Sequence, residues 1–162
     1  MAVLAVDANV SLVGGGTKVS GPAHQADIFY AGAILFALNV GTTGKISCVP
    51  TSGVNERFIG ICSKKQTTTA ADQLVEYYVG GIFLFPTIAA IASTDIGSWL
   101  VCDKSGTASD NPADLVFAGD ITPVTGDAVI GRIVGMDGSS NIYVDTDQGG
   151  GALLTVTSLA LQ

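Results

Sequence analysis

The sequence predicts an all-β protein: a compact β-barrel or β-sandwich of short antiparallel strands, with flexible N- and C-terminal arms. Three observations carry this prediction. Short runs rich in β-branched and aromatic residues alternate between two faces, which is the period of a half-buried strand. Turn residues separate these runs at intervals of about 8–12 residues, as in small sandwiches and barrels. Only residues 87–92 have the pattern of a helical turn, and so short a segment does not form a stable helix alone.

Residues 1–22 are expected to form an N-terminal arm. Two short apolar pieces, residues 3–6 and 10–13, precede Gly14-Gly15-Gly16. Three consecutive glycines favour a hinge over a regular element. Two interpretations stay open: an ordinary frayed terminus, and an apolar arm that lies on a partner.

The body of the protein is predicted over residues 23–148. Its first strands are residues 28–30 and 34–38, or one strand that bends at Gly32. A turn follows, because the next residues are rich in Gly, Asn and Thr. A further alternating strand is expected at residues 45–49.

The chain is organised around residues 58–85. Two strand-like runs, residues 58–62 and 74–79, flank a polar stretch at 63–73. This pattern predicts two antiparallel strands joined by a long exposed loop. Gly80-Gly81 then indicates a bulge or a close approach of another backbone.

The second half of the body contains more short strands. Residues 99–102, 115–117 and 127–134 are apolar and rich in β-branched residues. Residues 137–141 have the composition of a hairpin turn, and residues 142–144 are expected to return along the preceding strand.

Two of the predicted strands resemble each other. One reads Phe58-Ile59-Gly60-Ile61, and the other reads Val129-Ile130-Gly131-Arg132-Ile133. Two interpretations stay open: equivalent strands of two half-motifs, or a chance match.

Residues 149–162 are expected to form either a C-terminal arm or the last strand of the body. Gly149-Gly150-Gly151 provides a second flexible joint, and residues 152–161 carry no charge. An exposed apolar strand is an aggregation hazard unless it is paired, so the segment either completes its own sheet or lies on a neighbouring subunit. The candidate partner-contact residues of the two arms are Val3, Leu4, Val6, Val10, Leu12, Val13, Leu153, Leu154, Val156, Leu159 and Leu161.

Composition restricts the classes of partner. Only 13% of the residues are charged, against a typical share of about 25%, so much of the surface is small, polar or apolar. Such a surface is compatible with a thermostable or concentrated β protein, and it favours a subunit whose faces are covered by neighbours. The net charge of −7 and the scattered basic residues argue against nucleic-acid binding. No secretory signal and no apolar stretch of about 20 residues is recognisable, so we expect a protein that is made in the cytoplasm and does not enter a membrane.

No catalytic, cofactor or metal signature is present. Cys48, Cys62 and Cys102 lie far apart, form no Cys-x-x-Cys pair, and are expected to be buried free thiols. His24 is the single histidine, and no nucleophile-elbow motif accompanies it. The acidic residues near 137 and 145–147 lack the full calcium-loop pattern. We therefore expect a protein that is not an enzyme and has no cofactor.

A group of motifs resembles the small capsid decoration (cement) proteins of tailed bacteriophages. The similarity spans roughly residues 26–145 and depends on the spacing of glycines and apolar residues. The matching motifs are Ala26-Asp27-Ile28, Gly32-Ala33, Phe58-Ile59-Gly60-Ile61-Cys62, Ala70-Ala71-Asp72, Gly80-Gly81-Ile82-Phe83, Asp95-Ile96-Gly97 and Val129-Ile130-Gly131-Arg132-Ile133-Val134.

This resemblance implies a structural protein of the virion. It would bind the exterior of the mature phage head and stabilise the head by bridging subunits of the major capsid protein. It would also associate with itself, with a trimer favoured and a dimer possible. The alternative is a carbohydrate- or ligand-binding β module of a phage fibre or surface layer, which would need an exposed aromatic platform.

Overall fold

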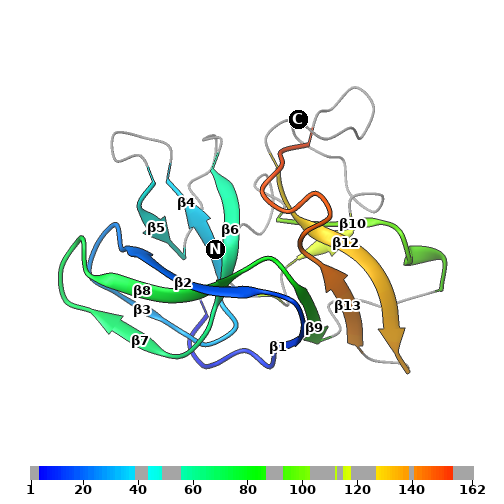
Figure 1. The fold of residues 1–162 in the computed structure, drawn as a ribbon, viewed down its shortest axis with the longest axis horizontal. Helices are drawn as coiled ribbons and strands as arrows, with labels where there is room; N and C mark the ends of the chain where they lie inside the picture. Colours follow the sequence, from blue (N-terminus) through cyan, green and yellow to red (C-terminus); the bar gives the residue numbers. More distant parts are fainter. Residues whose placement is uncertain are drawn as a thin grey trace.

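The structure is a computed structural model that describes residues 4–38, 44–48, 56–86, 93–102, 112, 115–117, 127–138 and 141–154. These residues form two large antiparallel sheets, side by side in Figure 1, and a small two-stranded sheet. The predicted all-β class is confirmed. The expected helical turn at residues 87–92 lies outside the described residues, and a short 3₁₀ turn, Ser93–Asp95, follows it.

The first large sheet has five strands in the order β2-β8-β6-β4-β5. Its strands are β2 (Thr17–Pro22), β4 (Ile34–Ala37), β5 (Ile46–Ser47), β6 (Arg57–Cys62) and β8 (Leu74–Val79). A single bridge between Ala23 and Ile46 brings its two edges together at one point, so this half of the molecule is barrel-like. The small sheet pairs β3 (Asp27–Phe29) with β7 (Gln66–Thr68). The predicted loop at 63–73 therefore contains a strand.

The second large sheet has six strands in the order β1-β9-β13-β12-β10-β11. Its strands are β1 (Ser11–Gly14), β9 (Ile82–Pro86), β10 (Trp99–Cys102), β11 (Val116–Phe117), β12 (Ala128–Asp137) and β13 (Asn141–Asp145). The predicted hairpin is confirmed, because β12 and β13 are antiparallel and Asp137 lies opposite Asn141.

The two large sheets share one plan. The strand order β2-β8-β6-β4-β5 corresponds to β9-β13-β12-β10-β11, and the strands follow each other along the chain in the same sequence. The irregularities correspond too. Leu35 lies opposite Gly60, Leu100 lies opposite Gly131, and in each sheet the register shifts immediately after that leucine.

Backbone hydrogen bonds at the turn before β4 and β10 support the same correspondence. The Gly32 N–H donates to the Cys62 carbonyl at 2.9 Å, and the Gly97 N–H donates to the Ile133 carbonyl at 2.7 Å. Both glycines have positive φ, 80° and 94°. The chain therefore contains two equivalent five-stranded units, which we call the first unit (residues 17–79) and the second unit (residues 82–145).

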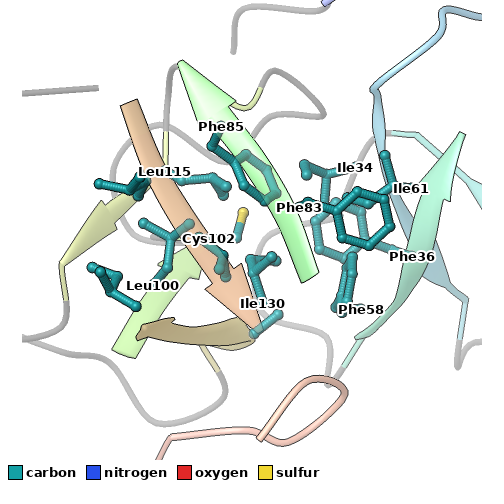
Figure 2. Packing of buried hydrophobic residues seen from close by; sticks show 14 of the residues in the cluster. Ile34, Phe36, Phe58, Ile61, Phe83, Phe85, Leu100, Cys102, Leu115 and Ile130 are labelled. Atoms are coloured by element: carbon teal, nitrogen blue, oxygen red, sulfur yellow. The ribbon is translucent and has the colours of Figure 1, made fainter. Parts of the chain in front are cut away.

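The largest core fills the second unit and receives side chains from the first. Figure 2 shows Phe83 and Phe85 of β9 and Ile130 of β12 packed together, with Phe36 and Phe58 of the first unit against them. All five residues are buried. The outer face of the first unit thus covers the core of the second.

The first unit has a separate core on the opposite face of its sheet. Leu35, Val75 and Cys62 line this face, and Phe29 of the small sheet and Leu4 of the N-terminal segment cover it. Strand β4 is buried on both faces, because alternate side chains enter the two cores. This explains its continuous apolar sequence.

Glycines form the crossing between the two sheets. The chain passes from β1 to β2 at Gly14–Gly16 and from β8 to β9 at Gly80-Gly81, and the two passages touch. A Cβ at Gly81 would lie 2.9 Å from the carbonyl oxygen of Gly14. Gly15 and Gly16 have φ of 68° and 79°, in the left-handed region that favours glycine. Within the expected N-terminal arm, residues 11–14 therefore form β1 of the six-stranded sheet and residues 17–22 form β2 of the five-stranded sheet. The triglycine is the packed corner between these two strands.

Candidate partner-contact surface

The N-terminal candidate residues divide into exposed and packed side chains. Val6 and Val13 are 69% and 55% exposed. Val10 and Leu12 pack against the core of the second unit, and Leu4 is buried in the first. Leu4 is thus a core residue of its own chain, and the two exposed valines remain candidates.

The C-terminal candidates Leu153 and Leu154 are also core residues of their own chain, at 1% and 0% exposure. Residues 151–154 run beside the start of β12, where the Val129 N–H donates to the Ala152 carbonyl and the Leu154 N–H donates to the Asp127 carbonyl, both at 3.0 Å. These bonds use backbone groups that β13 leaves free after it turns away. The other arm candidates, Val3, Val156, Leu159 and Leu161, lie outside the described residues.

The second triglycine makes this return possible. Gly149 and Gly151 have φ of 78° and 86°, and a Cβ at Gly150 would collide with the carbonyl oxygen of Thr146. The Arg57 guanidinium of β6 donates to the Gly151 carbonyl at 2.9 Å. The turn is therefore a defined connection between the units.

Other large apolar residues are exposed on the described strands. Leu74 begins β8 and is 69% exposed, and Val79 ends the same strand at 42%. Ile28 lies on β3 and Val134 on β12. The sequence contained the signal, an apolar residue on each face of a period-two run, but it does not identify which face is covered.

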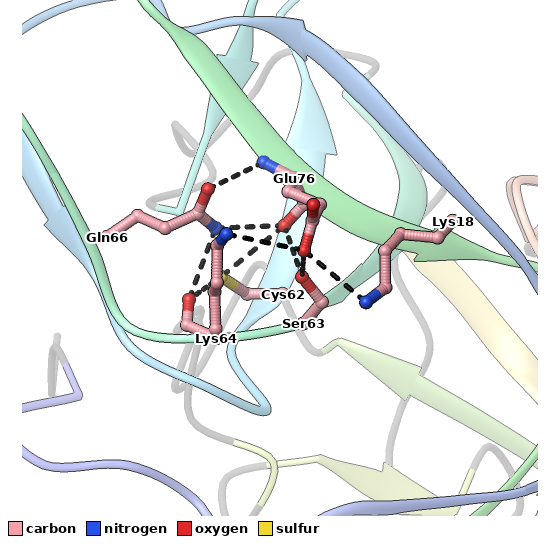
Figure 3. A network of polar contacts seen from close by, with 6 residues as sticks. All are labelled: Lys18, Cys62, Ser63, Lys64, Gln66 and Glu76. Atoms are coloured by element: carbon pink, nitrogen blue, oxygen red, sulfur yellow. Dashed lines mark hydrogen bonds and ion pairs between the residues drawn. The ribbon is translucent and has the colours of Figure 1, made fainter.

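A polar network fixes the segment after β6 to the middle of β8 (Figure 3). The Ser63 hydroxyl donates to the Glu76 carboxylate at 2.8 Å, and the ammonium groups of Lys18 and Lys64 lie 3.5 and 3.7 Å from the same oxygen. The Ser63 hydrogen bond and then these two positive charges lower the pKa of Glu76.

Gln66 continues this network through the backbone. Its side-chain amide donates to the Glu76 carbonyl at 2.9 Å, and its side-chain oxygen accepts from the Glu76 N–H at 2.8 Å. The amide thus reproduces the two hydrogen bonds that a neighbouring strand would make. These contacts hold the polar stretch, so its composition reflects a structural role.

A small pocket of about 160 Å³ lies between the two units. Its lining residues are Phe58, Ile59, Val79, Gly80, Thr146, Asp147 and Gly150. The Asp147 carboxylate accepts the Gly81 N–H at 3.1 Å, and the Thr146 hydroxyl donates to the Gly81 carbonyl at 2.8 Å. These polar groups connect the end of β13 to the glycine corner.

The groups considered for chemistry occupy separate places. Cys48, Cys62 and Cys102 are buried thiols that form no disulfide, as predicted. Burial raises the pKa of the Cys62 thiol, which keeps it in the unreactive protonated form. Among the described residues, no three His, Cys, Asp or Glu side chains gather in a group that could hold a metal ion. Within the same part of the chain, no helix has the length and apolar composition to cross a membrane.

Trp99 bears on the alternative of a carbohydrate-binding module. Its side chain is half-buried and packs beside Val101 and Leu154. The Arg132 guanidinium lies over its ring, 5.7 Å from the centroid. One face of this ring is therefore occupied by the chain's own cation.

Comparison with known proteins adds no relative. No family model matches the chain, and neither the curated proteins nor the solved structures contain a significant match.

Proposed function

We propose that this protein is a capsid decoration protein. It binds the outside of a mature phage head and stabilises the head by bridging subunits of the major capsid protein. The role is structural and not enzymatic, and the protein acts as a homo-oligomer, with a trimer favoured because a closed ring of three suits a threefold position.

The observation that carries the proposal is the exposure of large apolar side chains on a sheet-built body that has few charges. Val6, Val13 and Leu74 are each more than half exposed, and only 13% of the chain is charged. Exposed large apolar side chains together with a low share of charges form the kind of surface that neighbouring subunits commonly cover. The motif resemblance supplies the identity of the partner.

The bridging mechanism follows from ordinary interface energetics. Each subunit buries uncharged surface across a joint between capsid subunits, and several attachment points in one oligomer raise the effective concentration of each contact. The net charge of −7 favours the outer surface, away from packaged DNA, because like charges repel.

The test uses expanded shells from the phage that encodes this chain, prepared without the protein. Purified protein is added, and electron cryomicroscopy locates the new density. We expect a regular exterior lattice and a higher temperature of shell rupture. Shells that remain bare at high protein concentration contradict the proposal.

A pair of variants tests the apolar contact. Val13→Asp places a charge at an exposed apolar position of β1, and we expect it to weaken shell binding. Thr67→Asp introduces the same charge at an exposed position of β7 and is the matched control. Equal binding by both variants would exclude the β1 surface from the contact.

A further inference from the structure

We propose that the outer edge of β2, at Lys18 and Ser20, receives an extended segment from a second copy of this chain, and that this segment is residues 155–162. The proposal concerns self-association. It does not depend on the surface to which the oligomer attaches.

In the second unit, a strand occupies the edge that corresponds to the outer edge of β2. On β9, residues 82–84 pair with β13 on one side and with β1 on the other. The positions of the first unit that correspond to residues 82–84 are residues 18–20 of β2, because Ile82 lies opposite Asp145 as Lys18 lies opposite Tyr78. An antiparallel strand therefore covers one of two equivalent edges. Among the described residues, no strand covers the other.

Hydrogen bonds at the end of β2 show which of its groups point outward. The Ala23 N–H donates to the Gln73 carbonyl and the Ala23 carbonyl accepts from the Asp72 N–H, both at 2.8 Å, so Ala23 faces β8. Residues alternate between the two sides of an antiparallel strand. The backbone groups of Lys18 and Ser20 therefore face away from β8.

The same alternation holds in β9, where the Gly81 carbonyl faces β13 and accepts from the Thr146 N–H at 2.9 Å. Ile82 and Leu84 consequently face β1. They are the counterparts of Lys18 and Ser20. The outward backbone groups of β2 therefore correspond to the backbone groups of β9 that pair with β1.

The Lys18 side chain leaves this edge accessible. Lysine on an edge strand commonly prevents pairing with another chain. Here its ammonium lies 3.5 Å from the Glu76 carboxylate and 5.4 Å from the centroid of the Tyr78 ring. Both partners belong to β8, so the charge is directed across the sheet.

Residues 155–162 have the composition of the missing strand. They carry no charge, and Ser158-Leu159-Ala160-Leu161 is similar to Ser11-Leu12-Val13-Gly14, the sequence of β1. The residues that lead into them, 151–154, are bonded along the start of β12 in the second unit, whereas the open edge of β2 belongs to the first unit. We therefore assign them to the β2 edge of a second copy. Pairing with another copy through main-chain hydrogen bonds is an established mode of association.

Two variants of one position test the edge. Ser20→Pro removes the outward N–H and places a ring where the incoming strand would lie, while the bonds to β8 remain. Ser20→Ala keeps the N–H and is the matched control. Sedimentation should show self-association weakened about tenfold or more for Ser20→Pro and unchanged for Ser20→Ala.

Deleting residues 155–162 tests the occupant and keeps the buried Leu153 and Leu154. The shortened protein should lose self-association. A peptide of residues 155–162 added in trans should slow amide exchange at Lys18 and Ser20. Circular dichroism and the melting temperature establish that each variant is folded.

Three results would overturn the proposal. The shortened protein could associate as the full chain does, or Ser20→Pro could leave association unchanged. Alternatively, the tail could protect Lys18 and Ser20 in a monomer at every concentration, which would make the contact internal to one chain. Failure to bind shells would contradict the proposed function alone, since none of these measurements involves a shell.

Discussion

Replacing Leu153 by Ala tests whether residues 151–154 belong to the fold of their own chain. The Leu153 side chain is 1% exposed and lies in the core that both units share. The substitution removes three carbon groups from that core, which costs about 2.4 kcal/mol at about 0.8 kcal/mol per buried group. The cavity that remains adds to this loss, and measured Leu→Ala changes in cores run from about 2 to 5 kcal/mol.

We therefore expect the free energy of unfolding to fall by about 3 kcal/mol. For a chain of this size the melting temperature should fall by about 6–12 °C, at about 2–4 °C per kcal/mol. Urea unfolding followed by circular dichroism gives the free energy, and calorimetry gives the melting temperature. Val13→Ala is the control, because Val13 is 55% exposed and its loss should change the stability by less than about 0.5 kcal/mol.

An unchanged stability of Leu153→Ala would refute this reasoning. It would mean that residues 151–154 do not pack on β12 in solution, and that the whole segment after Gly149-Gly150-Gly151 is available to a partner.

Three further predictions follow from the same structure. Gly60→Ala and Gly131→Ala should each destabilise the protein by about 1–3 kcal/mol in urea unfolding, because the new Cβ would collide with the carbonyl oxygen of a neighbouring strand. Gly14→Ala is the control and should be tolerated, since no atom lies within 4 Å of its new Cβ. Equal effects of all three substitutions would contradict the argument. The lowered pKa of Glu76 means that its carboxylate stabilises the fold above pH 4.5 and loses that contribution as the pH falls through the folded-state pKa. Melting curves from pH 7 to pH 3 should therefore decline less for Glu76→Gln than for the parent, and parallel curves would count against the network. Because the three buried thiols form no disulfide, a reducing agent should leave the melting temperature unchanged, and a fall of several degrees would reveal a disulfide.

The all-β class of this protein was predictable from the sequence. Period-two runs identified β6, β8, β12 and β13, since alternation along a strand is a local property. The hairpin at residues 137–141 was equally predictable, because turn chemistry depends on a few adjacent residues.

In the sequence, the correspondence between the two units was recognisable at only one pair of strands, β6 and β12. Gly60 and Gly131 stand at corresponding positions because each lies against the backbone of the next strand, where a side chain does not fit. Gly32 and Gly97 also correspond, as do Leu35 and Leu100, but other corresponding positions hold different residues, such as Lys18 and Ile82 or Tyr78 and Asp145. Backbone hydrogen bonds fix strand order and register with many different side chains, so the shared plan leaves little trace in the sequence.

Whether the expected arms are hinged or packed on the body depends on tertiary contacts that the sequence does not show. Both triglycines predicted flexible joints, because three glycines lack the side chains that restrict a free backbone. Gly15 instead lies against Gly81, and Gly150 lies against Thr146. Gly81 and Gly15 are far apart in the sequence, and the contact exists only after both sheets have formed.

The same dependence on distant residues explains why Leu153 and Leu154 are buried in their own chain and why β7 is a strand. An uncharged segment after a glycine run is compatible with a partner or with its own sheet, and the choice depends on whether β12 leaves backbone groups unpaired. Likewise, the polar residues of β7 form a strand because Thr68 meets Asp27 of β3, with the Asp27 N–H donating to the Thr68 hydroxyl at 2.9 Å. Local sequence sets what a segment can form, and a distant partner strand determines where it is held.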